Sequence, residues 1–164
     1  GVLWKWAHWC GTPPLWAVIP DVPGNAARTI ERWAKEAPSI TRWPRAIAVQ
    51  DGMSGKDVKR LDPAPDVIAV GGTDEWKQET AEMWATTFPR VHVLRCNSPE
   101  WLYELEAIGV ESCDGAGWHR GDKTQTAGLE RWARSKAQPI TTDLTPFLPS
   151  GGKRHPKQRS LYET

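Results

Sequence analysis

The stretch Asp66-Val67-Ile68-Ala69-Val70-Gly71-Gly72 decides the fold class of this chain. Its unbroken apolar run is typical of a short β-strand that is buried on both faces. Thr73 follows as the N-cap of a helical pattern, and acidic residues in the first helical turn complement the helix dipole. A buried strand that passes directly into a helix predicts a parallel β-sheet with helical crossovers.

The same alternation of apolar runs and helical patterns extends in both directions along the chain. Further strands are predicted at Leu15–Ile19, Arg45–Gln50, Arg90–Arg95 and Val110–Cys113. Helices are predicted at Asn25–Glu36, Ser54–Leu61, Thr73–Phe88, Ser98–Ile108 and Thr124–Ser135. In the longest of these helices, the expected inner stripe is Trp76, Thr80, Met83, Trp84 and Phe88. The pattern predicts an α/β fold with five parallel strands.

Two architectures fit this alternation: a doubly wound open sheet, and part of a (β/α)8 barrel. Complete barrels usually need about 250 residues, whereas this chain has 164. A barrel formed by this chain would therefore be incomplete. The sequence begins with Gly rather than Met, which fits a fragment or a processed chain.

Composition narrows the class of protein further. The chain is 39% hydrophobic and 25% charged, with a net charge of +1, which predicts a globular domain and leaves room for a local basic surface. No apolar run has the length of a membrane span, and no signal peptide pattern opens the chain. The three cysteines lack CxxC spacing, so they predict neither a disulfide framework nor a zinc cluster. We expect a reducing, cytoplasmic location.

The ends of the predicted strands carry residues that can do chemistry. They are Asp21, Gln50 with Asp51, Gly71-Gly72, Arg95 with Asn97, and Asp114. Because the carboxyl ends of parallel strands lie at one edge of a sheet, these residues are expected to converge. The alternative is that they only cap helices and form turns.

Such a set can bind a flat purine. A carboxylate accepts two neighbouring N–H groups, as a guanine edge offers, and an amide donates to a carbonyl. Backbone N–H groups of Gly71 and Gly72 can approach a base closely because no Cβ intervenes. A second carboxylate could attack or stabilise an anomeric carbon as an oxocarbenium-like state develops.

In this order and spacing, the motifs resemble those of the tRNA-guanine transglycosylase family, over about residues 16–121. The segments that resemble the family motifs are Val18-Ile19-Pro20-Asp21, Ala48-Val49-Gln50-Asp51-Gly52, Val70-Gly71-Gly72, Val93-Leu94 through Asn97-Ser98-Pro99, and Gly109-Val110-Glu111-Ser112-Cys113-Asp114. The family consists of TIM-type (β/α)8 barrels that exchange guanine for a 7-deazaguanine base. The resemblance therefore implies that residues 1–136 form a partial barrel, incomplete at its N-terminus, with a Pro/Thr-rich loop and basic tail at 137–164.

The resemblance also implies roles for single residues. Asp114 matches the nucleophile that forms a covalent glycosyl-enzyme intermediate, and Asp21 matches the acid that reads the guanine edge, so both are candidate catalytic residues. Gln50, Gly71, Gly72 and Leu94 match base-binding positions. His119 and Arg120 match basic residues near the nucleic-acid backbone. No cofactor and no metal are implied, and the partners are guanine or a 7-deazaguanine and tRNA or DNA.

The sequence departs from the family in two places. The Asp-x-Gly-Gly-Phe strand and the Cys-x-Cys-x2-Cys…His zinc site are both absent, so zinc-less relatives that modify DNA are more similar than the bacterial tRNA enzyme. A second copy or a partner chain could complete the barrel. Two alternatives stay open: a non-catalytic base-binding or nucleic-acid-binding remnant, and an unrelated α/β phosphosugar enzyme with an anion site at Gly115–Gly121. The basic run Gly151–Arg159 is either a solvated end or a phosphate contact.

Overall fold

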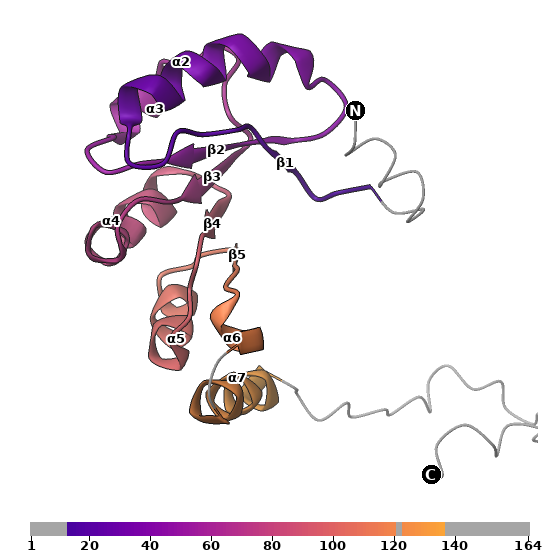
Figure 1. Ribbon diagram of the computed structural model, residues 1–164, viewed down its shortest axis with the longest axis vertical. Helices are drawn as coiled ribbons and strands as arrows, with labels where there is room; N and C mark the ends of the chain where they lie inside the picture. Colours follow the sequence, from indigo (N-terminus) through magenta and orange to yellow (C-terminus); the bar gives the residue numbers. More distant parts are fainter. Residues whose placement is uncertain (1–12, 121–122, 137–164) are drawn as a thin grey trace, which may run out of the picture.

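The structure is a computed structural model that describes residues 13–120 and 123–136, with only the backbone at 119 and 120. Five strands alternate with helices along the chain (Figure 1). The strands are β1 (Ala17–Val18), β2 (Arg45–Val49), β3 (Val67–Val70), β4 (Val91–Val93) and β5 (Ser112–Cys113). The helices are α2 (Ala26–Glu36), η1 (Ala37–Ser39), α3 (Gly55–Lys59), α4 (Asp74–Thr87), α5 (Pro99–Ala107), α6 (Gly117–Arg120) and α7 (Lys123–Lys136).

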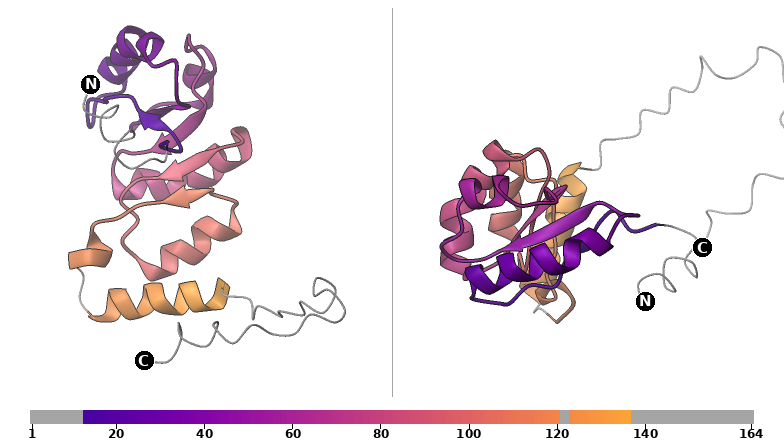
Figure 2. Two further views of the ribbon diagram at one scale, coloured as in Figure 1. Left: turned by 90° about the vertical axis from the view of Figure 1, so that its right-hand side faces the viewer. Right: turned by 90° about the horizontal axis from the view of Figure 1, so that it is seen from above.

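The strands form one parallel sheet in the order β1-β2-β3-β4-β5. A doubly wound sheet reverses its strand order at a switch point, and this sheet has no reversal. The sheet is curled, with helices α2 to α5 on its convex face (Figures 1 and 2). The fold is therefore an α/β half-barrel, which is compatible with a partial (β/α) barrel and differs from the doubly wound alternative.

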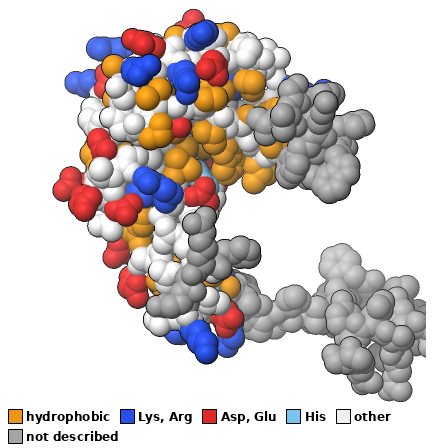
Figure 3. Space-filling view, in the orientation of Figure 1, with side chains coloured by type: hydrophobic (Ala, Val, Ile, Leu, Met, Phe, Trp, Pro, Cys, Tyr) orange, Lys and Arg blue, Asp and Glu red, His pale blue; other side chains and the backbone are white. Residues whose placement is uncertain are grey.

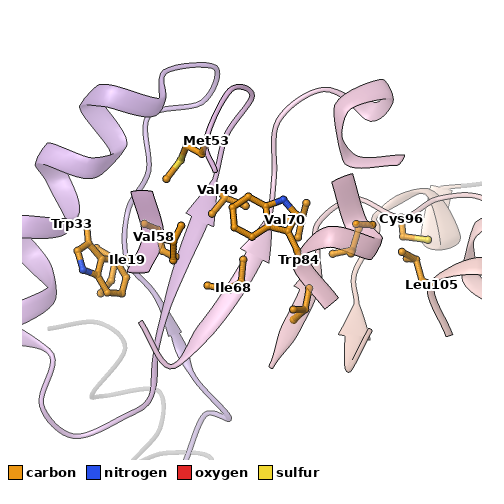
Figure 4. Packing of buried hydrophobic residues seen from close by; sticks show 14 of the residues in the cluster. Ile19, Trp33, Val49, Met53, Val58, Ile68, Val70, Trp84, Cys96 and Leu105 are labelled. Carbon is orange, nitrogen blue, oxygen red and sulfur yellow. The ribbon is translucent and has the colours of Figure 1, made fainter. Parts of the chain in front are cut away.

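The main hydrophobic core lies between the sheet and these helices. Alternate strand residues, such as Ile47, Val49, Ile68 and Val70, face Trp33 of α2 and Trp84 of α4 (Figure 4). Both tryptophans are almost completely buried. Burying one large apolar side chain stabilises a fold by roughly 2–3 kcal/mol, so this layer fixes the helices on the convex face.

The concave face of the sheet has a second, smaller cluster made of Ala46, Ala48, Val67 and Ala69, packed against Trp16 and Leu94. Trp16 also reaches β4, where its ring centroid lies 5.3 Å from that of His92. Small residues suit this face because the curl of the sheet brings neighbouring side chains together. Hydrophobic side chains are visible along the hollowed side of the molecule (Figure 3).

Several predicted details are wrong. β1 is shorter than Leu15–Ile19 and is not buried on both faces, because Leu15 is 73% exposed and Val18 is 41% exposed. In α4, Met83 is exposed and Lys77 is buried on the inner stripe instead. β1 pairs with β2 alone and β5 with β4 alone among the described residues, so both are edge strands.

β4 and β5 are also shorter than the predicted strands Arg90–Arg95 and Val110–Cys113. Four helix starts do follow local signals that the sequence carries. Asn25, Ser54, Thr73 and Ser98 each accept a hydrogen bond from a backbone N–H of the helix that they begin. Within the described ranges, no helix combines the length and apolarity needed to cross a membrane. The predicted loop and tail at 137–164 lie outside the described residues.

Candidate functional site

The carboxyl ends of β1 to β4 surround an open hollow of about 590 Å³. All five residues that the sequence suggested for base binding line it: Asp21, Gln50, Gly71, Gly72 and Leu94. They follow four different strands, and the parallel sheet brings these strand ends to one edge. The structure therefore places this part of the predicted site in a single cavity.

Asp21 is oriented by Gln50. Gln50 Nε2 donates to Asp21 Oδ2 at 2.7 Å, and Gln50 Oε1 accepts from the Gly24 N–H at 2.9 Å. Gln50 is only 2% exposed, so its amide is held at both ends in a buried position. A carboxylate has about four lone-pair sites, which leaves Asp21 able to accept N–H groups from a ligand. Gln50 thus positions the acid.

Gly71 and Gly72 form part of the wall of the hollow. A Cβ on Gly71 would lie 2.9 Å from Val49 O, and a Cβ on Gly72 would lie 2.8 Å from Asp51 Oδ1. Gly72 also has φ of +80°, a conformation that favours glycine. The Gly71 N–H already donates to Val49 O at 2.9 Å. The N–H of Gly71 is therefore already paired with the backbone of β2.

Asp51 and Lys77 hold the frame of this hollow. Asp51 Oδ1 accepts from the Thr73 N–H at 3.1 Å and from Thr73 Oγ1 at 2.9 Å, which ties β2 to the start of α4. Lys77 is completely buried, and its Nζ donates to Leu94 O at 2.8 Å and lies 2.7 Å from Asp74 Oδ1. The hydrogen bond from Lys77 lowers the pKa of Asp74, and the charge of Arg95 lowers it further. These contacts fix α4 against β4.

Asp114 lies at the same end of the sheet but outside this hollow. It follows edge strand β5, and its Oδ1 accepts from the Arg95 N–H at 2.7 Å. Its Oδ2 lies 3.6 Å from His92 Nε2. Arg95 does line the hollow, and its Nη2 donates to Gly72 O. The two acids thus do not share one cavity in the described part of the chain, and Arg95 lies between them.

His92 is buried on the concave face, and its Nδ1 lies 2.9 Å from Ser112 Oγ. Burial lowers the pKa of His92, although the nearby Asp114 carboxylate acts in the opposite direction. The ring is therefore neutral at neutral pH. A neutral imidazole beside Asp114 leaves the negative charge of that carboxylate without a histidinium partner.

A second hollow, of about 490 Å³, lies on the other side of Asp114. Its walls are mainly apolar and include Leu102, Trp118, Leu129 and Trp132. Trp118 belongs to α6, a single turn of helix, and packs against the main core. The Asn97 side chain fixes the start of α6 by accepting from the Gly117 N–H at 2.7 Å.

The two thiols of Cys96 and Cys113 also meet beside this second hollow. A hydrogen bond between them raises the pKa of Cys96 and lowers that of Cys113, while burial raises the pKa of both. The side chains of His119 and Arg120 lie outside the described part of the structure, and so does their predicted contact with nucleic acid. Among the described side chains, no group of three His, Cys, Asp or Glu residues is placed to hold a metal.

Arg95 and Lys77 were not singled out as site residues from the sequence. Arg95 was noted only as a residue at a strand end, and its φ of +59° is not visible in the residue type. Lys77 did carry a signal, because Lys77, Ala81, Trp84 and Phe88 repeat at helical spacing on one stripe. A lysine within an apolar stripe indicates a buried cation with a specific partner.

The site therefore consists of a polar hollow that contains the oriented carboxylate of Asp21. The carboxylate of Asp114 lies outside this hollow, after edge strand β5, and Arg95 lies between the two acids. Comparison with family models, curated proteins and solved structures finds no match for this chain.

Proposed function

We propose that this chain is a glycosyltransferase that exchanges guanine for a 7-deazaguanine base in nucleic acid. The observation that carries the proposal is the hollow in which Asp21, Gln50, Gly71, Gly72 and Leu94 meet. Its polar groups suit the edge of a purine, and Leu94 offers an apolar surface to the ring face. Most small-molecule sites combine a largely apolar cavity with a few placed polar groups.

In this proposal, Asp21 binds the purine edge. The Gln50 amide holds Asp21 Oδ2 at 2.7 Å, so the carboxylate is oriented before a base arrives. Preorganised acceptors bind more tightly because less rotational freedom is lost on binding. A guanine and a 7-deazaguanine share this edge, so one acid can serve the departing base and the arriving base.

Asp114 is the proposed nucleophile. One carboxylate oxygen is held by the Arg95 N–H at 2.7 Å, and the other attacks C1′ of the nucleotide while the bond from C1′ to the guanine nitrogen breaks. The sugar is then held as an ester on Asp114. The departing guanine takes up a proton from solvent. The nitrogen of the incoming 7-deazaguanine then attacks the same carbon, gives up its proton to solvent and releases Asp114. No redox step or cofactor is needed for this exchange.

A second candidate function is base binding without catalysis. It is favoured by one observation, which is that Asp114 lies outside the hollow that contains Asp21. A further segment or a partner chain at the open edges of the half-barrel would then be needed to bring the two acids around one nucleotide.

An exchange assay separates these candidates. The full chain is incubated with radiolabelled guanine and a guanine-containing RNA or DNA, and label in the polymer is measured. We expect wild type to incorporate label and Asp114→Asn to lose at least about a thousandfold in rate. Normal exchange by Asp114→Asn would refute the assignment of the nucleophile. Base binding by wild type without any exchange would favour the second candidate.

A further inference from the structure

Arg95 contacts both halves of the candidate site. Its backbone N–H donates to Asp114 Oδ1 at 2.7 Å, and its guanidinium donates to Gly72 O at the wall of the hollow. Arg95 has φ of +59°, the only positive φ of a non-glycine residue in the described ranges. This conformation costs an ordinary residue about 1–2 kcal/mol. Backbone strain of this kind is often retained where a side chain must be aimed at a ligand.

Arg95 is also the one cation among the described residues that line the hollow. The charged lining residues are otherwise the acids Asp21, Asp51, Asp74 and Glu75. Two of these acids already have partners, because Asp51 accepts from Thr73 and Asp74 is paired with the buried Lys77 at 2.7 Å. The exposed guanidinium of Arg95 forms no ion pair with these acids in the described part of the chain, although its charge lowers the pKa of Asp74.

A guanidinium carries five N–H groups in a planar fork, and Gly72 O accepts from one of its nitrogens. Arginine binds phosphate through two parallel hydrogen bonds when such donors are available. The side chain of Arg95 is exposed at the rim of the hollow, so a phosphate can reach it from solvent.

The proposed function determines where a phosphate of the substrate would lie. With the base in the hollow and C1′ facing Asp114, the sugar must lie over the residue that separates them, which is Arg95. The phosphates of a nucleotide are attached to that same sugar. A polymer substrate would therefore bring a phosphodiester to this guanidinium, whereas a free base would not.

We propose that Arg95 binds the backbone phosphate that flanks the target nucleotide, so that it recruits nucleic acid to the hollow. The inference rests on the proposed function for the placement of the sugar. It assigns to Arg95 a role in binding the polymer and none in binding the free base.

The test compares polymer binding with base binding. A short fluorescent oligonucleotide with one guanine, made as DNA and as RNA, is titrated with the full chain at several salt concentrations. Free guanine and a 7-deazaguanine are titrated separately by calorimetry. Arg95→Gly removes the guanidinium, keeps the N–H that holds Asp114, and suits the positive φ. Arg60→Ala is the matched control, because Arg60 is exposed and lies at the end of α3 outside the hollow.

We expect Arg95→Gly to weaken binding of the oligonucleotide about tenfold or more. The slope of log affinity against log salt should become shallower by about 0.7, and base affinity should stay unchanged. Arg95→Lys should restore the salt slope while recovering only part of the affinity, since an ammonium lacks the planar fork. Arg60→Ala should bind both ligands like wild type.

Equal oligonucleotide affinity and salt slope for wild type and Arg95→Gly would overturn the inference, as would a parallel loss of base affinity. If wild type binds the oligonucleotide through Arg95 but binds no purine, the phosphate contact stands and the proposed exchange function fails. Comparison of the DNA and RNA titrations shows which of the two polymers binds through Arg95.

Discussion

The two hollows beside Arg95 differ in how they are built. The hollow at the ends of β1 to β4 is lined by several acids, an amide and bare backbone, and it receives one wall from each of four consecutive strands. The hollow beside β5 is lined mainly by apolar side chains of α5, α6 and α7, together with the acids Glu106, Glu111 and Asp114. The difference teaches that the recognition groups gather where four consecutive strand ends meet, and Asp21 joins them although β1 is itself an edge strand. Asp114 follows the other edge strand, β5, and lines the hollow that α5, α6 and α7 border.

The largest expected effect on stability is at the frame of the polar hollow. Lys77→Ala leaves Leu94 O without its buried donor and opens a cavity next to Trp101, whose ring lies 5.2 Å from Nζ. We expect a loss of about 3 kcal/mol in the free energy of unfolding. Lys77→Met keeps most of the packing and should lose about 1–2 kcal/mol. Urea unfolding monitored by tryptophan fluorescence measures both.

Lys56→Met is the control, because Lys56 is exposed on α3. Its free energy of unfolding should stay within about 0.5 kcal/mol of wild type. A wild-type value for Lys77→Ala would show that the buried lysine does not hold α4 against β4.

The next largest expected effect is at the contact between α7 and α5, beside the apolar hollow. Gly128 is buried, and a Cβ at this position would lie 2.2 Å from Pro99 Cγ. Glycine to alanine within a helix normally stabilises by about 1 kcal/mol, but here the clash should reverse the sign. We expect Gly128→Ala to destabilise the protein by about 1–3 kcal/mol, which thermal unfolding measures.

Thr124→Ala is the matched control on α7, since Thr124 is exposed. It should be neutral or slightly stabilising, because alanine is the better helix former. Stabilisation by Gly128→Ala would mean that α7 does not pack on α5 as described.

The smallest effect concerns His92, whose ring contacts Ser112 of edge strand β5 and lies 3.6 Å from Asp114 Oδ2. Its pKa is lowered by burial, so the unfolded chain binds a proton below about pH 6.5 that the folded chain does not. Stability should therefore fall as pH decreases below 6.5, by at most about 1.4 kcal/mol per pH unit. His92→Gln should flatten this segment of the pH profile, which urea unfolding at a series of pH values measures. If stability depended on pH with the same slope in His92→Gln as in wild type, burial of His92 would not be the cause of this pH dependence.

Much of the fold was predictable because it depends on local patterns. β2 and β3 are unbroken apolar runs, and the caps at Asn25, Ser54, Thr73 and Ser98 all form as predicted. The strand ends also predicted which residues would line the polar hollow. These features follow from periodicity and helix signals, which any single sequence carries.

The remaining features depend on the curl of the sheet and on contacts across it. Asp114 follows edge strand β5 and lies outside the hollow, whereas Asp21 follows edge strand β1 and lines it, so the order of the strands does not predict which acid lines the hollow. The backbone conformation of Arg95 and the burial of Lys77 likewise arise from partners about 20 residues away in sequence. The turn of helix at α6 was not predicted, because glycine disfavours a helix and Gly117 begins it, and the Asn97 side chain fixes this start.

The central claim is that the polar hollow binds a purine through Asp21 and that Asp114 acts only on the sugar. Calorimetric titration of guanine and a 7-deazaguanine into wild type, Asp21→Asn and Asp114→Asn tests it most directly. We predict that Asp21→Asn weakens base affinity about tenfold or more, while Asp114→Asn binds the bases like wild type. Equal affinity for wild type and Asp21→Asn, or no binding to wild type at all, would contradict the claim.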